Sequence, residues 1–244
     1  MTVALKLAYK GTAYCGWQVQ KNAKSVQETL QDALEAAFGT RAPVTGCSRT
    51  DAGVHARGFV CKAQGVPDGI PVSRIPEALG TKLPHDIAVV EAWEVSEDFH
   101  PRYDAKGKRY CYYIRNARVR DPFTCETSAL WQKAIDESVC NELCLQLVGT
   151  HDFRSFMASG SDITDTVRTV TEFTCTREGE NVIFSVSADG FLYNMVRILV
   201  GTVLDLHDGA IKQSAAEILS AKDRTKAGRT MPACGLCLEE VFYN

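Results

Sequence analysis

The chain has 244 residues, of which 45% are hydrophobic and 23% are charged, with a formal net charge of −3. This is the composition of a soluble globular protein, and the charge balance excludes a chain that is basic throughout. The N-terminal segment lacks a signal-peptide layout because Lys6 interrupts a short alternating stretch. The most apolar stretch, 191–206, contains an Asn, an Arg and an Asp, so we expect no membrane span and a cytoplasmic protein.

Ten cysteines in a chain without a secretory signal indicate free thiols in a reducing cytoplasm. Two pairs raise the question of a metal site. Cys140 and Cys144 have helical i, i+4 spacing among apolar residues, and Cys234 and Cys237 border an expected strand. Structural zinc sites show tighter, repeated spacings with His. We therefore expect core thiols, which pack as small hydrophobic groups, and no metal.

The first hundred residues contain signals for six elements in the order β-α-β-β-α-β. Strict alternation predicts a strand over 3–9. A capping box at Ser25-Val26-Gln27-Glu28 predicts a helix that runs to Phe38 and ends at Gly39. The other expected elements are strands over 42–47, 59–64 and 87–95 and a short helix over 72–79.

The remainder repeats this order of elements, with one extra helix and no sequence repeat. An aromatic strand over 108–114 places Tyr110 and Tyr112 on one face. The segment 151–166 is polar and long, and is expected to be a loop. The other expected elements are helices over 132–147, 191–207 and 214–221 and strands over 166–176, 182–188 and 236–242.

The element order predicts an α+β protein made of two tandem split β-α-β (ferredoxin-like) units. We expect mixed, mainly antiparallel sheets joined around a central cleft. The N-terminal half, 1–100, carries a loop with Asp51, and the C-terminal half, 101–244, carries the tyrosine strand and the helix with Arg197.

The loop 46–56 is rich in small residues and contains Arg49, Thr50 and Asp51 where a strand is expected to end. Glycine allows close approach to a ligand, and loops on a rigid scaffold often carry catalytic groups. A surface turn with a solvated ion pair has the same composition. His55 lies four residues from Asp51, and a structural role is favoured over acid–base catalysis because catalytic partners are defined by geometry.

Arg197 is unusual because it interrupts an apolar helix, and a buried Arg needs a partner. Asp51 is one candidate, and the alternative is a structural ion pair with Asp205 or another acid. Other basic residues cluster in 101–120 and in 222–229, which suits either phosphate-binding patches on a net acidic protein or solvated faces.

Six segments, in order along the chain, closely resemble the motifs of the tRNA pseudouridine synthase A family. The most specific is Arg49-Thr50-Asp51-Ala52-Gly53-Val54-His55-Ala56. The others are Tyr9–Gln18 followed by Ser25–Gln27, Asp98–Arg102 with Lys108–Tyr112, His151–Phe156, Phe191–Arg197 and Ala233–Leu238. The resemblance covers nearly the whole chain. Ser48 stands where the family commonly has Gly, and Lys10 where it often has Asp.

The resemblance implies an isomerase that detaches uracil from ribose, rotates it and rejoins it through carbon, without cofactor or metal. It implies that Asp51 is the nucleophile and that Arg197 pairs with it. Tyr110 is expected to pack on the target base, Arg49 to hold phosphate or help to flip the nucleotide, and Leu236 to line the pocket. The implied substrate is tRNA rather than DNA, at uridines 38, 39 and 40 of the anticodon stem-loop, and the implied assembly is a homodimer.

Three alternatives stay open at this point. The chain could be a non-catalytic RNA-binding module with the same fold, or a cysteine-based metal or redox protein. It could also be a related synthase that modifies other tRNA positions, which motifs alone discriminate poorly.

Overall fold

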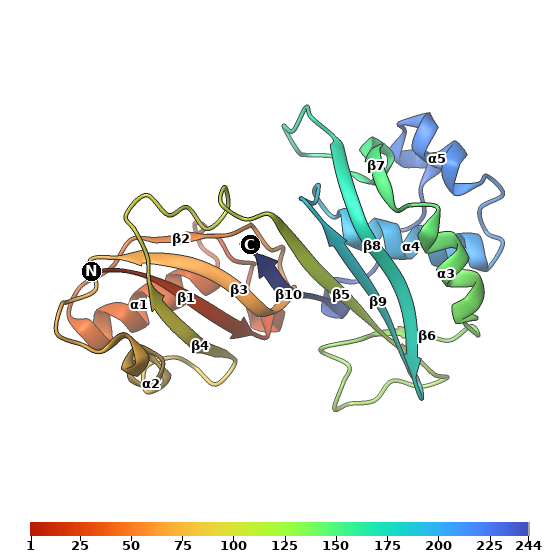
Figure 1. The fold of residues 1–244 in the computed structure, drawn as a ribbon. Coiled ribbons are helices and arrows are strands. Elements are labelled where there is room, and N and C mark those ends of the chain that lie inside the picture. The colour runs from red at the N-terminus through yellow and green to blue at the C-terminus, as the bar shows by residue number, and fades with distance from the viewer. Residues whose placement is uncertain (244) are drawn as a thin grey trace. The chain divides into compact units, whose positions relative to one another are not determined.

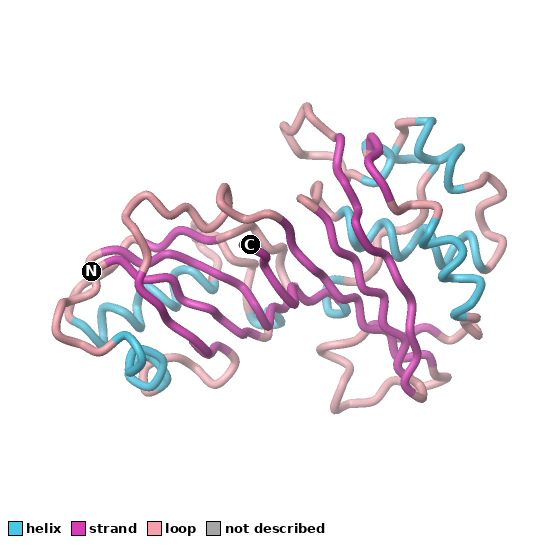
Figure 2. Tube along the Cα trace, viewed as in Figure 1, coloured by secondary structure: helices cyan, strands magenta, loops and turns pink. Residues whose placement is uncertain are grey.

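The computed structural model describes residues 1–243 and is α+β, as predicted (Figures 1 and 2). Contacts divide the chain into unit 1, which comprises Met1–Lys106 and the residues from Leu238 onward, and unit 2, which comprises Gly107–Cys237. The predicted division fell after residue 100. The segment that follows belongs with unit 1 because Pro101 O accepts a hydrogen bond from Tyr243 Oη at 2.8 Å and Lys106 N donates to Phe242 O at 2.7 Å.

The sheet of unit 1 has the strand order β4-β1-β3, all antiparallel. These strands are β1 (Thr2–Tyr9), β3 (His55–Gln64) and β4 (Ile87–Glu94). The short β2 (Val44–Gly46) pairs antiparallel with β3, and β10 (Leu236–Phe242) is also a neighbour of β3. With β2 beside β3, this is the strand order of the predicted split β-α-β unit.

The two α-helices of unit 1 are α1 (Val26–Phe38) and α2 (Ile75–Gly80). Two 3-10 turns, η1 (Gly11–Ala13) and η2 (Val72–Arg74), precede them. Helix α1 begins as predicted, because Ser25 Oγ accepts a hydrogen bond from Glu28 N, and it ends at Gly39 with φ 74°. The core of unit 1 is formed by fully buried side chains, among them Leu5, Leu7, Leu30, Leu34, Phe59, Ile75 and Leu79.

The sheet of unit 2 has the strand order β5-β9-β8-β7, again antiparallel. Its strands are β5 (Gly107–Asn116), β7 (Gly149–Asp152), β8 (Val167–Glu178) and β9 (Asn181–Ala188). One more strand, β6 (Ala129–Trp131), pairs parallel with β5, so the sheet is mixed and mainly antiparallel, as predicted. Strands β6 and β7 were not predicted, because three or four residues are too few to show an alternating pattern.

The α-helices of unit 2 are α3 (Glu137–Leu145), α4 (Met195–His207) and α5 (Ala215–Ala221). Three 3-10 turns complete the unit, namely η3 (Arg154–Phe156), η4 (Arg224–Lys226) and η5 (Ala233–Gly235). Within residues 1–243, no helix combines the length and the apolar character that crossing a membrane requires.

Two predicted helix starts were wrong, and a local cap explains each. Helix α3 begins five residues later than expected, because Asp136 is extended and its side chain accepts hydrogen bonds from Ser138 N and Val139 N. Helix α4 begins four residues later than expected, because Asn194 has φ 59° and ψ 12°. This left-handed conformation is incompatible with a right-handed helix.

The segment 228–231 runs along α4 and depends on a glycine in that helix. Gly228 N donates to Thr202 Oγ1 at 2.9 Å, and Asp205 accepts hydrogen bonds from Arg229 N at 3.0 Å and Arg229 Nε at 2.8 Å. A Cβ atom on Gly201 would lie 2.0 Å from Arg229 O. The close approach of this segment therefore requires glycine at position 201.

We predict that Gly201→Ala lowers the free energy of unfolding by about 1–3 kcal/mol, because the added methyl group overpacks the contact with Arg229 O. Intrinsic helix propensity alone would change stability in the opposite direction. The matched control is Gly80→Ala at the end of α2, where a Cβ would meet nothing within 4 Å. Urea unfolding of both variants is the measurement, and equal stability of the two would contradict the packing argument.

Candidate active site

Asp51 lies on the loop between β2 and β3, where the sequence predicted it. Val54 N donates to Asp51 O at 3.1 Å, which closes a turn, and Gly53 has φ 79°, a conformation that favours glycine. The side chain of Asp51 is half-buried and that of Arg49 is exposed. The loop thus presents a carboxylate on a tight turn with an arginine nearby in the sequence.

A second loop, which follows β1, fixes the residue before Asp51. Thr50 O accepts a hydrogen bond from Trp17 N at 3.1 Å, and Thr50 Oγ1 lies 2.9 Å from Tyr9 Oη. A Cβ atom on Gly16 would lie only 2.2 Å from Thr50 O. Trp17 fills the core, with its ring centroid 4.1 Å from that of Phe59. Thr50 is therefore held through both its backbone and its side chain.

His55 connects the loop that follows β1 to the loop that carries Asp51. It is 5% exposed, and its Nδ1 accepts a hydrogen bond from Gly11 N at 3.0 Å. A Cβ atom on Gly11 would lie 2.0 Å from Val54 O, so the two loops touch through their backbones. The geometry supports the structural interpretation of His55, which satisfies a buried N–H group.

Arg197, in the first turn of α4, is half-buried and is held by neutral acceptors. Its Nε donates to Met231 O at 2.6 Å, and its Nη1 donates to Asn194 Oδ1 at 2.6 Å. The alternative partner, Asp205, lies eight residues further along the helix, about 12 Å along its axis. Asp205 is instead paired with Arg229 at 2.5 Å. The predicted alternative of an Arg197–Asp205 pair is therefore wrong.

Tyr110 and Tyr112 occupy alternate positions of β5 and are both buried, which confirms that they share a face. The ring of Tyr110 is 7% exposed and meets the ring of Phe191 edge to face, with centroids 5.1 Å apart. Tyr112 donates its hydroxyl to Pro232 O at 2.6 Å. Burial raises the pKa of Tyr112, and the Arg197 guanidinium partly opposes this rise.

Leu236 follows η5, at the end of the segment that also contacts Arg197 and Tyr112. A Cβ atom on Gly235 would lie 2.5 Å from Tyr112 Cζ, so this segment packs tightly on β5. Leu236 is buried directly after this contact. The residues 231–236 therefore connect two of the predicted site positions, Arg197 and Leu236, to Tyr112 on β5.

Three partners in this region were not identified from the sequence: the carbonyl groups of Met231 and Pro232 and the amide of Asn194. Backbone carbonyl groups carry no sequence signal. Asn194 does carry one, because asparagine is enriched in left-handed backbone positions.

The predicted site residues lie in two units. Asp51 and Arg49 belong to unit 1, whereas Tyr110, Arg197 and Leu236 belong to unit 2. The pairing of Asp51 with Arg197 and the cleft between the halves stay predictions.

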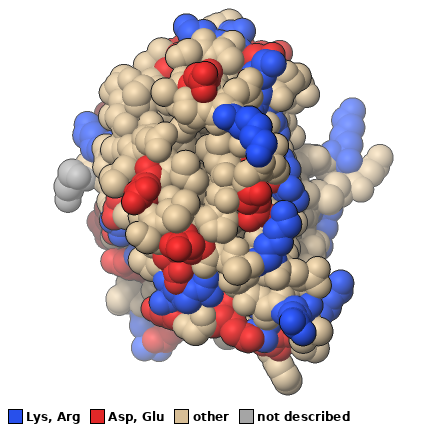
Figure 3. All heavy atoms as spheres, turned by 90° about the vertical axis from the view of Figure 1, so that its right-hand side faces the viewer, with Lys and Arg blue, Asp and Glu red and all other residues tan. Residues whose placement is uncertain are grey.

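Part of the basic clusters is neutralised by local ion pairs. Arg115 pairs with Glu180 at 2.6 Å and lies 3.9 Å from Asp121, and Arg229 pairs with Asp205. The face drawn in Figure 3 carries both basic and acidic side chains among uncharged ones. Charge on this face is therefore mixed rather than uniformly positive.

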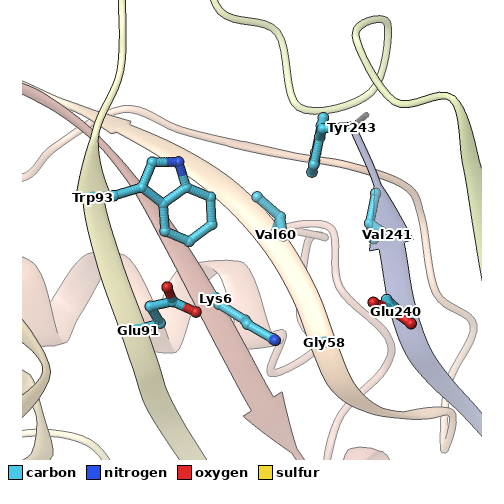
Figure 4. A pocket seen from close by; sticks show the side chains of 8 residues that line it. All are labelled: Lys6, Gly58, Val60, Glu91, Trp93, Glu240, Val241 and Tyr243. Atoms are coloured by element: carbon cyan, nitrogen blue, oxygen red, sulfur yellow. The ribbon is translucent and has the colours of Figure 1, made fainter.

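Two surface hollows have none of the predicted site residues in their lining. The hollow in unit 1, about 350 Å³ in volume, lies over β1, β3 and β4 and has Trp93 and Tyr243 among its walls (Figure 4). It combines one lysine, Lys6, with two acids, Glu91 and Glu240, so it is not a phosphate site by charge. The hollow in unit 2, about 200 Å³, is lined by the end of β5, the loop that follows it and β6, together with Pro232 and Cys234.

Comparison with known proteins identifies the family. The family model described as tRNA pseudouridine synthase matches residues 7–104 and 143–244. The chain is 43% identical over 242 residues to a protein of Clostridium kluyveri and 43% identical to one of Acetivibrio thermocellus, both named tRNA pseudouridine synthase A. A protein of the same name from Clostridium acetobutylicum is 42% identical. Each match covers 99% of both chains.

Among solved structures, the chain is similar to one described as a crystal structure of a Cbf5-Nop10-Gar1 complex. The TM-score is 0.38 at 11% identity, and the match covers 97% of this chain and 58% of that chain.

The family model and the relatives define an isomerase that acts on a nucleotide within RNA. The chain belongs to the tRNA pseudouridine synthase family, and tRNA pseudouridylation is the reaction that this membership assigns to it.

We predict that His55 contributes to stability and not to proton transfer. His55→Asn keeps an acceptor for Gly11 N and is expected to retain kcat. His55→Leu leaves this buried N–H group unpaired and is expected to lose about 1–3 kcal/mol of unfolding free energy. Urea unfolding and initial rates on tRNA distinguish the two roles. If His55 transferred a proton in the reaction, His55→Asn and His55→Leu would both lose activity.

Proposed function

We propose that this protein converts uridine to pseudouridine at positions 38, 39 and 40 of the tRNA anticodon stem-loop, with Asp51 as the nucleophile. One observation carries the proposal. The stretch 49–56, which closely resembles the family signature, forms a loop in which Thr50 is held by Trp17 and Tyr9 and Asp51 closes a turn with Val54. A catalytic carboxylate needs such fixed support, because misplacement by about 1 Å can cost on the order of 100-fold in rate.

The reaction is an isomerisation, so the atoms of substrate and product are the same. The bond between ribose C1′ and the uracil nitrogen breaks, and a bond between C1′ and a uracil carbon forms. The proton on that carbon is lost and the released nitrogen gains a proton, so the overall composition is unchanged. Asp51 is proposed to act by attack on C1′ or on the base, or by assisting elimination; attack is covalent catalysis by a carboxylate. No cofactor or metal is required for this bond exchange.

The other predicted residues have distinct proposed roles. The Arg197 cation pairs with Asp51 and keeps the carboxylate ionised. The Tyr110 ring packs on the target base and its phenol takes part in proton transfer, a role supported by the edge-to-face contact with Phe191 that fixes this ring. Leu236 forms a pocket wall. Arg49, which is exposed, holds phosphate or helps to extrude the nucleotide from its stack.

The proposed partner is tRNA, and the proposed assembly is a homodimer in the cytoplasm. Exposed basic residues in 101–120 and 222–229 would contact phosphates, which position RNA without reading its sequence. Two copies together would present more of this basic surface than one net acidic chain.

The decisive experiment maps pseudouridine in unmodified tRNA after incubation with the wild type or with Asp51→Asn. We expect conversion at positions 38–40 by the wild type and loss of turnover by the variant, which keeps the side chain's shape and removes its charge. Circular dichroism and filter binding should show that folding and tRNA affinity are retained.

Each other outcome has a defined meaning. Substantial conversion by Asp51→Asn would remove Asp51 as nucleophile. Tight binding without conversion by either protein would establish a non-catalytic RNA-binding module. Conversion at another tRNA position would keep the chemistry and change the substrate.

We also predict that Arg197→Leu abolishes conversion and lowers stability, because it removes the cation proposed for Asp51 and leaves Met231 O and Asn194 Oδ1 without their donor. The thermal midpoint and single-turnover conversion are the two readouts. Full activity of this variant would contradict the proposed pairing.

A further inference from the structure

Asn194 combines an uncommon backbone conformation with an uncommon use of its side chain. It has φ 59° and ψ 12° at the N-cap position of α4, and its carbonyl accepts the first hydrogen bond of the helix, from Ile198 N at 3.1 Å. An asparagine at this position ordinarily accepts a hydrogen bond from a free N–H group of the first turn. Here the side chain makes no capping hydrogen bond. Its oxygen accepts from Arg197 Nη1 at 2.6 Å.

The guanidinium of Arg197 is therefore held by two acceptors from different parts of the chain. Asn194 Oδ1 binds Nη1, and Met231 O binds Nε at 2.6 Å. Met231 is itself fixed, because its N–H group donates to Arg197 O at 3.2 Å. Because the guanidinium is planar and its donors have a fixed geometry, two bonds at different nitrogens set its orientation.

Both acceptors are neutral. Their neutrality is important because the proposed role of Arg197 is to form an ion pair with a carboxylate. An amide and a carbonyl oxygen orient the guanidinium without cancelling its charge. An aspartate in place of Asn194 would retain the acceptor and compete for the cation. The Asn194 side chain thus makes no capping hydrogen bond to α4 and instead accepts a hydrogen bond from Arg197 through a neutral oxygen.

We propose that Asn194 is a positioning residue that orients Arg197 for its interaction with the catalytic carboxylate. This inference rests on the proposed function, in which Arg197 pairs with Asp51. Asn194 itself touches neither substrate nor reacting atoms in this assignment. It acts only through Arg197.

The test variant is Asn194→Gly, because glycine adopts φ 59° without strain and lacks the amide. We expect kcat to fall on the order of 10-fold or more, since misorientation of a catalytic group slows the chemical step. KM for tRNA should stay within about twofold of the wild-type value, since no RNA contact is removed.

The matched control is Asn22→Gly in unit 1. Asn22 is also an asparagine at positive φ, 63°, and it is exposed. The control should leave kcat and KM for tRNA unchanged, because no part of the Arg197 environment is altered in it.

A double-mutant cycle separates positioning from a general structural role. Arg197→Lys removes the forked guanidinium, so Asn194→Gly should have little further effect in that background under single-turnover conditions. A drop of the same size in both backgrounds, or an unchanged kcat in Asn194→Gly, would overturn the inference. Failure of the proposed function is recognised separately, by conversion with Asp51→Asn or by the absence of conversion with the wild type. An inactive Asp51→Asn with a fully active Asn194→Gly would reject the positioning role alone.

Discussion

The segment 228–236 is the constraint on which the organisation of unit 2 depends. Its first part lies along α4, where Gly201 permits a close approach and Asp205 binds Arg229. Its middle part exchanges hydrogen bonds with Arg197 through Met231, and its last part packs on Tyr112. One irregular stretch thereby joins the helix that carries Arg197 to the strand that carries Tyr110. The order of helix, segment and strand is maintained by backbone groups, which tolerate little displacement.

The loop of Asp51 in unit 1 is likewise held in place by contacts between backbone groups. Backbone groups at Thr50, Val54 and Gly11 are bound or in close contact, and three glycines, at positions 11, 16 and 53, make these approaches possible. The side chains of Tyr9 and His55 supply further hydrogen bonds from buried positions. Rigidity around a half-buried carboxylate suits chemistry in which the nucleophile must be placed before the substrate arrives.

Individual arginine side chains, rather than the net charge of the chain, provide the electrostatic interactions discussed for this protein. The net charge of −3 gives no overall attraction for RNA, and ion pairs engage Arg115 and Arg229. Two of the partners of the Arg197 side chain are neutral oxygens. A guanidinium oriented by neutral groups retains its charge for a further interaction, which is the physical basis of the role proposed for it.

The sequence by itself determined the family, the α+β class and the elements with strong local signals. The capping box defined α1, the alternating pattern defined β1, and the last strand was predicted at its observed bounds, 236–242. Tertiary structure decided the rest. Strands β6 and β7 exist because β5 and β8 pair with them, and α4 starts late because Asn194 is left-handed. The partners of Arg197 and Tyr112 include carbonyl groups more than thirty residues away in the chain. Every residue carries such a carbonyl, so only the folded chain determines which of them are used.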